Sequence, residues 1–163
     1  MSLAAEVLDA ARRAGAMIAT AESCTGGLIV AALTDIAGSS DVVDRGFVTY
    51  SNAAKIQMLG VSQATLDVHG AVSEEIAAEM ASGALKRSTA DFAVAVTGIA
   101  GPGGSEHKPE GRVCFGLAGP TGVMVETVEF GALGRSNVRA KTVEHALDLL
   151  LKALSNQRAS DKT

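Results

Sequence analysis

Helix-like and strand-like segments alternate along this chain, and that order limits its fold more than any other feature. Hydrophobic periodicity predicts helices over residues 3–14, 26–36, 51–59, from 73 onward, and 135–154. Strands are predicted over residues 16–20, 47–50 and 91–97, with a hairpin over 113–118 and 123–130. Strands joined through helices lie parallel, whereas a hairpin adds antiparallel strands. The pattern therefore predicts a three-layer α/β/α sandwich with a mixed sheet.

The chain is long enough to bury the core of one domain. Its 163 residues predict a single domain over residues 1–163, in which the polar tail 155–163 is expected to fray. Hydrophobic residues make up 47% of the chain but aromatic residues only 3%. The core must therefore be built from Ala, Val, Leu and Ile, which suits tightly layered α/β folds.

Charge and sequence pattern exclude several classes of partner. The formal net charge is -4 and no basic block occurs, so a nucleic-acid partner is not expected. Charged residues such as Glu6, Asp9 and Arg12 interrupt the N-terminal apolar residues, and no apolar run has membrane-spanning length. We therefore expect no signal peptide, no membrane partner and a cytoplasmic location. Apolar helical faces and hairpin edges favour a homo-oligomer.

The turn Thr20-Ala21-Glu22-Ser23-Cys24-Thr25-Gly26-Gly27 concentrates reactive side chains between a predicted strand and a predicted helix. Backbone N–H groups at a helix start can bind an anion or stabilise an oxyanion. Ser23 is either a nucleophile or the N-terminal cap of the following helix, and its position alone favours the cap. A nucleophilic serine needs a base, and no motif links any of the three histidines to Ser23. A lysine is the obvious substitute.

Lys55 is the candidate for the base that would activate Ser23. It follows the strand-to-helix turn Tyr50-Ser51-Asn52, from which its amine can reach a cleft at the strand ends. Partial desolvation there would lower the lysine pKa and supply neutral amine. The alternative is a solvated lysine on a helix surface. Tyr50, the only tyrosine in the chain, either packs in the core or orients a ligand through its hydroxyl.

The glycine-rich segment Thr97-Gly98-Ile99-Ala100-Gly101-Pro102 follows the predicted strand 91–97. It matches neither the Walker loop nor the dinucleotide fingerprint, so its role is either ligand binding or purely conformational. Arg139 could pair with a ligand phosphate or simply be solvated. Cys24 is a competing nucleophile, although a buried thiol is the simpler interpretation. We interpret Cys24 and Cys114 as free thiols and, because no metal-ligand spacing occurs, we assign no metal.

Taken together, these motifs resemble the CinA C-terminal domain family. The resemblance covers nearly the whole chain through segments in one order: 21–27, 38–40, 46–55, 69–74, 97–102 and 108–111. One segment departs from the family pattern, in which a phenylalanine is followed by Gly-Asp-Arg and by a second arginine four residues later. This chain has Phe130, Leu133-Gly134-Arg135 and Arg139, so the acidic position is lost.

The resemblance implies a nicotinamide-nucleotide amidohydrolase, which converts nicotinamide mononucleotide to nicotinate mononucleotide and ammonia without a cofactor or metal. Its small-molecule partner would be a pyridine mononucleotide. The family pattern implies Ser23 as the nucleophile, Lys55 as its general base and Tyr50 beside them. The expected substrate-binding residues are Glu22, Thr25, Gly26, Gly27, Thr97, Gly98 and Arg139, with Arg139 on the phosphate.

Two rival hypotheses remain open. A non-catalytic pyridine-nucleotide-binding or regulatory module of the same family would keep the pocket without hydrolysis. A cysteine-dependent amidase would act through Cys24 in place of Ser23. In longer relatives the domain follows a pyrophosphatase-type domain, whose activity is not expected here.

Overall fold

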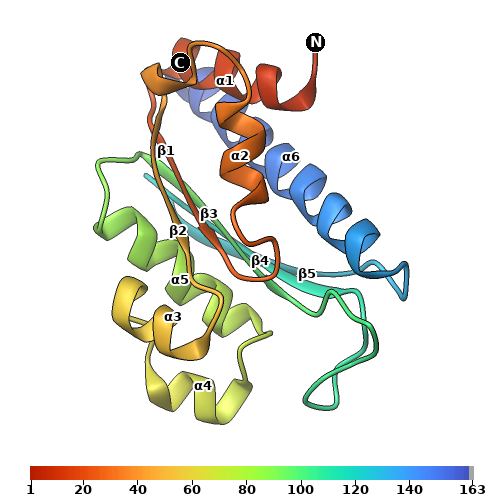
Figure 1. Cartoon of the computed structure of the whole chain (residues 1–163). Coiled ribbons are helices and arrows are strands. Elements are labelled where there is room, and N and C mark those ends of the chain that lie inside the picture. Colours follow the sequence, from red (N-terminus) through yellow and green to blue (C-terminus); the bar gives the residue numbers. More distant parts are fainter. Residues whose placement is uncertain (162–163) are drawn as a thin grey trace.

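A five-stranded mixed sheet forms the middle layer of the computed structural model, which describes the backbone of residues 1–161 and the side chains of residues 1–157 (Figure 1). The strands are β1 (Ile18–Glu22), β2 (Val43–Val48), β3 (Phe92–Gly98), β4 (Arg112–Gly119) and β5 (Gly122–Glu129), in the order β2-β1-β3-β4-β5. β1 pairs in parallel with β2 and β3, whereas β4 is antiparallel to β3 and β5. The predicted mixed sheet is confirmed.

Two sets of helices cover the two faces of this sheet. α1 (Leu3–Ala14), α2 (Leu28–Thr34) and α6 (Arg135–Asp161) lie on one face, and α3 (Asn52–Leu59), α4 (Gln63–His69) and α5 (Glu74–Lys86) lie on the other (Figure 1). α5 packs directly on the sheet, while α3 and α4 pack on α5. A short 3-10 turn, Ser39–Asp41, connects α2 to β2. The predicted three-layer arrangement is also confirmed.

Capping residues begin and end the helices where the sequence predicts. The Ser51 hydroxyl accepts a hydrogen bond from Ala54 N–H at the start of α3, and Ser73 caps α5 in the same way. Gly60 adopts a φ of 70° directly after α3, a left-handed conformation that favours glycine. Local chemistry therefore sets both ends of the helix that carries Lys55.

Some boundaries near the site differ from the prediction. β1 begins at Ile18 and β2 at Val43, so Tyr50 lies beyond β2 instead of ending it. α2 was expected to be packed well inside the domain, but it buries only Ile29 and Leu33. Its other side is open to solvent because α2 lies over the β2 edge of the sheet.

Two further differences concern helices away from the site. The sequence analysis did not predict α4, whose seven residues are too few for a clear hydrophobic period. The last helix continues beyond Leu154 to Asp161, so the tail expected to fray from residue 155 is helical as far as Asp161, and residues 162–163 lie outside the described range. No glycine or proline interrupts residues 155–161, so nothing local ends the helix.

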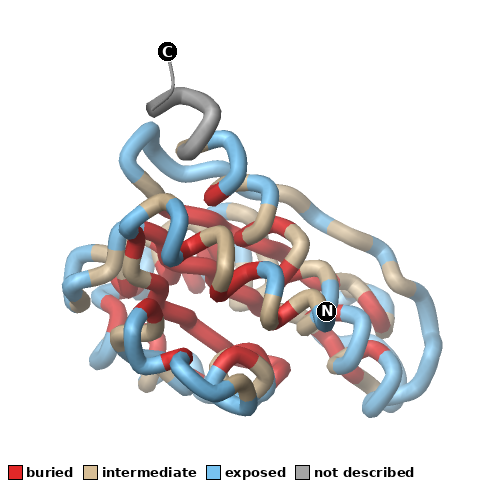
Figure 2. Tube along the Cα trace, turned by 90° about the horizontal axis from the view of Figure 1, so that it is seen from above, coloured by how far each residue is buried: buried red, intermediate tan, exposed pale blue. Residues whose placement is uncertain are grey.

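Side-chain size differs between the two faces of the sheet. Towards α1, α2 and α6 the strands present large residues such as Ile18 and Phe115, and towards α5 they present small ones such as Ala93. A Cβ added to Gly116 of β4 would lie 2.4 Å from Ala77 O of α5. α5 therefore lies unusually close to the sheet, which explains a core with few aromatic residues. Figure 2 shows the buried positions concentrated along the strands and the helix sides that face them.

Gly83→Ala should destabilise the fold, although alanine normally favours a helix over glycine. A Cβ at Gly83 of α5 would lie 2.0 Å from Leu59 O at the end of α3. We expect the overlap to lower the free energy of unfolding by about 1–3 kcal/mol, as measured by urea denaturation. The control, Ser82→Ala, should change it by about 0.5 kcal/mol or less. An unchanged or more stable Gly83→Ala protein would contradict the close packing of α3 on α5.

Candidate active site

The ends of three neighbouring strands bring the predicted site residues together. β2, β1 and β3 are parallel, so their carboxyl ends meet at one edge of the sheet. Ser23 follows β1, Thr49 and Tyr50 follow β2, and Gly98 ends β3. The chain leaves β1 through α2 on one face and leaves β2 through α3, α4 and α5 on the other (Figure 1). Open α/β sheets usually bind ligands where the connections diverge in this way.

The hydroxyl of Ser23 lies against the amine of Lys55. Ser23 N–H donates to Val96 O at 3.1 Å, which ties the turn to β3. Ser23 Oγ lies 2.9 Å from Lys55 Nζ and 3.4 Å from Tyr50 O. The hydroxyl does not cap α2, because the N-cap residue of α2 is Gly27, which has no side chain to form a cap. The helix-cap interpretation of Ser23 is therefore wrong, and the structure brings the serine and the lysine together.

Lys55 is almost completely buried, with only 1% of its surface exposed. It lies in the first turns of α3, and its Nζ donates to Thr49 O at 3.1 Å and to Tyr50 O at 3.3 Å. Burial lowers the pKa of Lys55 below its usual range, because an ammonium group loses its hydration there. The interpretation of Lys55 as a solvated surface lysine is therefore wrong.

Both carboxylate oxygens of Glu22 are bonded inside the turn. Oε1 accepts from Thr25 Oγ1 at 2.6 Å and from Ile29 N–H at 2.8 Å, and Oε2 accepts from Val30 N–H at 3.0 Å. Glu22 therefore supplies the cap that α2 would otherwise lack, with its negative charge at the positive end of the helix. Glu22 and Thr25 are wholly buried. In this structure both side chains hold the turn, and their contact with substrate stays a prediction.

Arg139 holds the same turn from α6. Its Nε donates to Cys24 O and its Nη2 to Thr25 O, both at 3.1 Å. These bonds give Arg139 a positioning role, and its contact with a substrate phosphate stays a prediction. Gly26 and Gly27 have φ angles of 58° and 107°, so the turn itself requires glycine at both positions. Their contact with substrate also stays a prediction.

A cleft of about 360 Å³ lies between Tyr50, the loop after β3 and the segment before α5. Ser23 and Lys55 do not line it, but Tyr50 does, and the backbone oxygen of Tyr50 lies 3.4 Å from Ser23 Oγ. Gly98 lines it, and a Cβ added there would lie 2.6 Å from the Val113 side chain. Thr97 does not line the cleft: it is 1% exposed and donates through Oγ1 to Ala71 O at 2.8 Å. The Thr97 hydroxyl therefore holds one wall of the cleft, and its contact with a ligand stays a prediction.

Arg135 is a cleft residue that the sequence analysis did not include in the site. Its Nη2 donates to Tyr50 OH at 2.8 Å and its Nη1 to Gly101 O at 2.7 Å. The Tyr50 side chain is 59% exposed, so Tyr50 is not a core packing residue. The signal that could have revealed Arg135 is its place in the family's Gly-Asp-Arg pattern, at the first position of the last helix.

Known proteins match the sequence and the fold of this chain over most of its length. The family model of the CinA C-terminal domain matches residues 1–154. The chain belongs to this family. Among its CinA relatives, nicotinamide-nucleotide amidohydrolase PncC of Escherichia coli is 51% identical over 151 residues, which cover 92% of each chain.

Two other CinA relatives show how far the likeness extends. The crystal structure of the competence/damage inducible protein CihA from Agrobacterium tumefaciens has 54% sequence identity and a TM-score of 0.89, with 94% of this chain and 93% of that chain covered. A CinA-like protein of Mycolicibacterium gilvum is 52% identical over 147 residues, which cover 90% of this chain and 35% of that longer protein. The CinA domain therefore occurs both alone and within larger proteins.

Cys24 lacks the properties of an activated nucleophile. Burial raises the pKa of its thiol to about 11, against the lowered value that a reactive cysteine needs. Cys24 and Cys114 are both free thiols, as predicted, and both are buried. Within residues 1–161, no group of three or more His, Cys, Asp or Glu residues could hold a metal ion. The helices described over the same range include none that is long and apolar enough to span a membrane.

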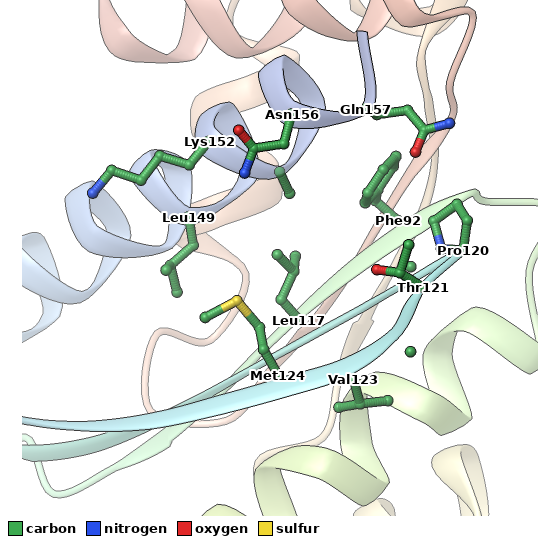
Figure 3. A pocket seen from close by; sticks show the side chains of 13 residues that line it. Phe92, Leu117, Pro120, Thr121, Val123, Met124, Leu149, Lys152, Asn156 and Gln157 are labelled. Atoms are coloured by element: carbon green, nitrogen blue, oxygen red, sulfur yellow. The ribbon is translucent and has the colours of Figure 1, made fainter. Parts of the chain in front are cut away.

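A second hollow lies at the other end of the sheet. It has a volume of about 620 Å³ and lies between the hairpin turn and α6, with Phe92, Leu117 and Leu149 on its apolar side (Figure 3). Lys152 and Asn156 belong to its polar rim. Phe92 begins β3, whereas the Ser23 turn lies at the end where β3 finishes. This hollow is therefore larger than the cleft but far from the serine–lysine pair.

Glu22→Ala should destabilise the protein more than the same substitution at an exposed acidic residue. The change leaves Ile29 N–H and Val30 N–H without their acceptor, and Ile29 is buried. We expect the free energy of unfolding to fall by about 2–4 kcal/mol in urea denaturation. Glu144→Ala on the surface of α6 is the control, with an expected loss of about 0.5 kcal/mol or less. Equal losses in the two variants would mean that Glu22 does not hold the turn.

Proposed function

We propose that this CinA-family protein hydrolyses the carboxamide of nicotinamide mononucleotide, giving nicotinate mononucleotide and ammonia. The observation that carries the proposal is the 2.9 Å approach of Lys55 Nζ to Ser23 Oγ beside a cleft. The Escherichia coli relative, 51% identical, is named a nicotinamide-nucleotide amidohydrolase. The volume of about 360 Å³ also suits a small-molecule substrate. Assembly into a homo-oligomer and a cytoplasmic location stay predictions.

The surroundings of Lys55 suit a general base in its neutral form. A neutral amine has two N–H bonds and one lone pair. With the two N–H bonds directed at Thr49 O and Tyr50 O, the lone pair faces Ser23 Oγ. The lowered pKa of Lys55 makes this neutral form available at a lower pH than for a solvated lysine. Two backbone carbonyls would therefore orient the base towards the nucleophile.

The proposed reaction proceeds through an ester of Ser23. Ser23 Oγ attacks the carboxamide carbon while Lys55 Nζ accepts the hydroxyl proton, and backbone N–H groups of the Ser23 turn stabilise the oxyanion. Protonated Lys55 then gives its proton to the departing nitrogen, the C–N bond breaks and ammonia leaves. Lys55 next accepts a proton from water, which attacks the ester. Lys55 returns this proton to Ser23 Oγ as the ester C–O bond breaks, and the acid product loses its own proton to solvent and leaves as the carboxylate.

Ser23→Ala and Lys55→Met should each lower the rate of ammonia release from nicotinamide mononucleotide by roughly a thousandfold or more, because one removes the nucleophile and the other the base. Methionine keeps most of the length of the lysine side chain, so Lys55→Met leaves little empty space. Thermal unfolding checks that each variant is folded. Turnover retained in either folded variant would reject the serine–lysine pair.

The same assay separates the rival hypotheses. Cys24→Ala and Cys24→Ser should retain most of the wild-type activity, whereas a cysteine-dependent amidase would lose it in Cys24→Ala. Calorimetric binding of the mononucleotide without ammonia release by the wild-type protein would instead favour the non-catalytic module. Nicotinamide mononucleotide, the corresponding dinucleotide, the riboside and free nicotinamide should be compared, so that the assay also determines which substrate the cleft accepts.

The rate of ammonia release should rise with pH as Lys55 loses its proton. The base works only when deprotonated, so activity is lost as the pH falls through the pKa of Lys55. Because burial lowers that pKa, the midpoint should lie below the usual lysine value. Cys24→Ser should keep the rise and should not raise its midpoint, because the charge of Cys24 acts to raise the pKa of Lys55. A rise centred near pH 11, where the Cys24 thiol ionises, would point to the cysteine instead.

A further inference from the structure

Arg135 brings positive charge to the cleft. Its guanidinium donates to Tyr50 OH at 2.8 Å and to Gly101 O at 2.7 Å. Arg135 is the one basic residue among those that line the cleft, all of which lie in the described part of the chain, and Glu106 is the acidic one. Both acceptors of Arg135 are neutral, so these bonds leave the charge of the guanidinium uncompensated.

A guanidinium in this setting suits an anionic group of the substrate. Arginine binds phosphate oxygens through paired, charge-assisted hydrogen bonds, which are roughly twice as strong as bonds between neutral groups. A phosphate would therefore compete well with a tyrosine hydroxyl and a backbone carbonyl. Arg139 is less suited to this task, because it does not line the cleft and its two hydrogen bonds hold the Ser23 turn.

Glu110 connects the cleft loop to the helix that begins with Arg135. Its Oε1 accepts from Gly103 N–H at 2.7 Å, within the loop after β3. Its Oε2 accepts from Gly134 N–H at 3.2 Å, directly before α6, and Gly134 O accepts from Val138 N–H in the first turn of that helix. One carboxylate therefore fixes the distance between the loop and the start of α6.

The negative charge of Glu110 is also favourable at the start of α6. The family's aspartate is absent at Gly134, and the Glu110 carboxylate contacts the backbone of that residue at the N-terminus of α6, where negative charge is stabilising. Both of its oxygens bond to backbone N–H groups. Glu110 can therefore hold the helix start while Arg135 keeps its charge for a ligand.

We propose that Arg135 is the residue that recognises the substrate phosphate and that Glu110 is its positioning residue. The inference rests on the proposed function, because it concerns the same cleft and the same class of substrate. Glu110 acts on affinity for the phosphorylated substrate, through the backbone of Gly134, and takes no part in the chemistry at Ser23.

The test compares a phosphorylated substrate with its dephosphorylated counterpart. Ammonia release from nicotinamide mononucleotide and from nicotinamide riboside is measured for the wild type and for Arg135→Gln, Glu110→Ala and Glu110→Gln. Arg135→Gln should raise KM for the mononucleotide about ten- to a hundredfold, as the loss of a charged hydrogen-bonding partner does, with kcat and the riboside constants little changed. Glu110→Ala should also raise KM for the mononucleotide. Glu110→Gln, which keeps one acceptor oxygen, should raise it less.

A double variant shows whether Glu110 acts through Arg135. If it does, adding Glu110→Ala to Arg135→Gln should raise KM for the mononucleotide no further than Arg135→Gln alone. Glu144→Gln, on the surface of α6, is the charge-matched control and should leave all constants unchanged. Additive effects, or equal losses on the mononucleotide and the riboside, would mean that Glu110 only stabilises the loop and would overturn its positioning role.

Binding measurements keep this test separate from the proposed hydrolysis. Calorimetry on the Ser23→Ala protein gives dissociation constants for the mononucleotide and the riboside, with and without Arg135→Gln or Glu110→Ala. A preference for the mononucleotide that disappears in both variants supports the inference even if the wild type releases no ammonia. A preference that survives Arg135→Gln overturns it, even if the wild type proves to be an amidohydrolase.

Discussion

The contact between the Lys55 amine and the Ser23 hydroxyl is the interaction on which the rest of the site depends. An amine is costly to bury, and this one is enclosed where the parallel strands end, with hydrogen bonds to a hydroxyl and two backbone carbonyls. Burial and hydrogen bonding therefore act together: burial favours loss of the proton, and the carbonyls fix the direction of the amine. The low solvent exposure that gives Lys55 its altered pKa also prevents it from turning outward.

The Ser23 turn keeps its shape because it is held by opposite charges from two sides. The Glu22 carboxylate accepts N–H groups at the start of α2, and the Arg139 guanidinium donates to carbonyl groups of the same turn. A turn with two consecutive left-handed glycines has little rigidity of its own. Residues that the family pattern places near the substrate therefore contribute by holding backbone, and the cleft residue Arg135 comes from a distant part of the chain.

Much of the fold could be predicted because its signals are local. Serine caps, glycine stops and the two-residue hairpin turn act within a few residues, so α3, α5 and the β4–β5 hairpin lie where they were expected. α2 and the end of α6 were harder to predict. For α2, the apolar sequence does not show how much of the helix surface neighbouring elements will bury. For α6, a polar segment without glycine or proline can continue a helix.

The sequence by itself determined the order of helices and strands, the turn that carries Ser23 and the family pattern that pairs it with Lys55, because these depend on residue types at short spacings. Only the tertiary structure decided that Lys55 is buried against Ser23, that Glu22 and Thr97 face inward, and that Arg135 lines the cleft whereas Arg139 does not. The contacts of Lys55, Thr97 and Arg135 each join segments 26 or more residues apart that meet at one edge of the sheet. The spacing of residues along the chain does not show which polar side chains will form hydrogen bonds within the fold and which will remain available to a ligand.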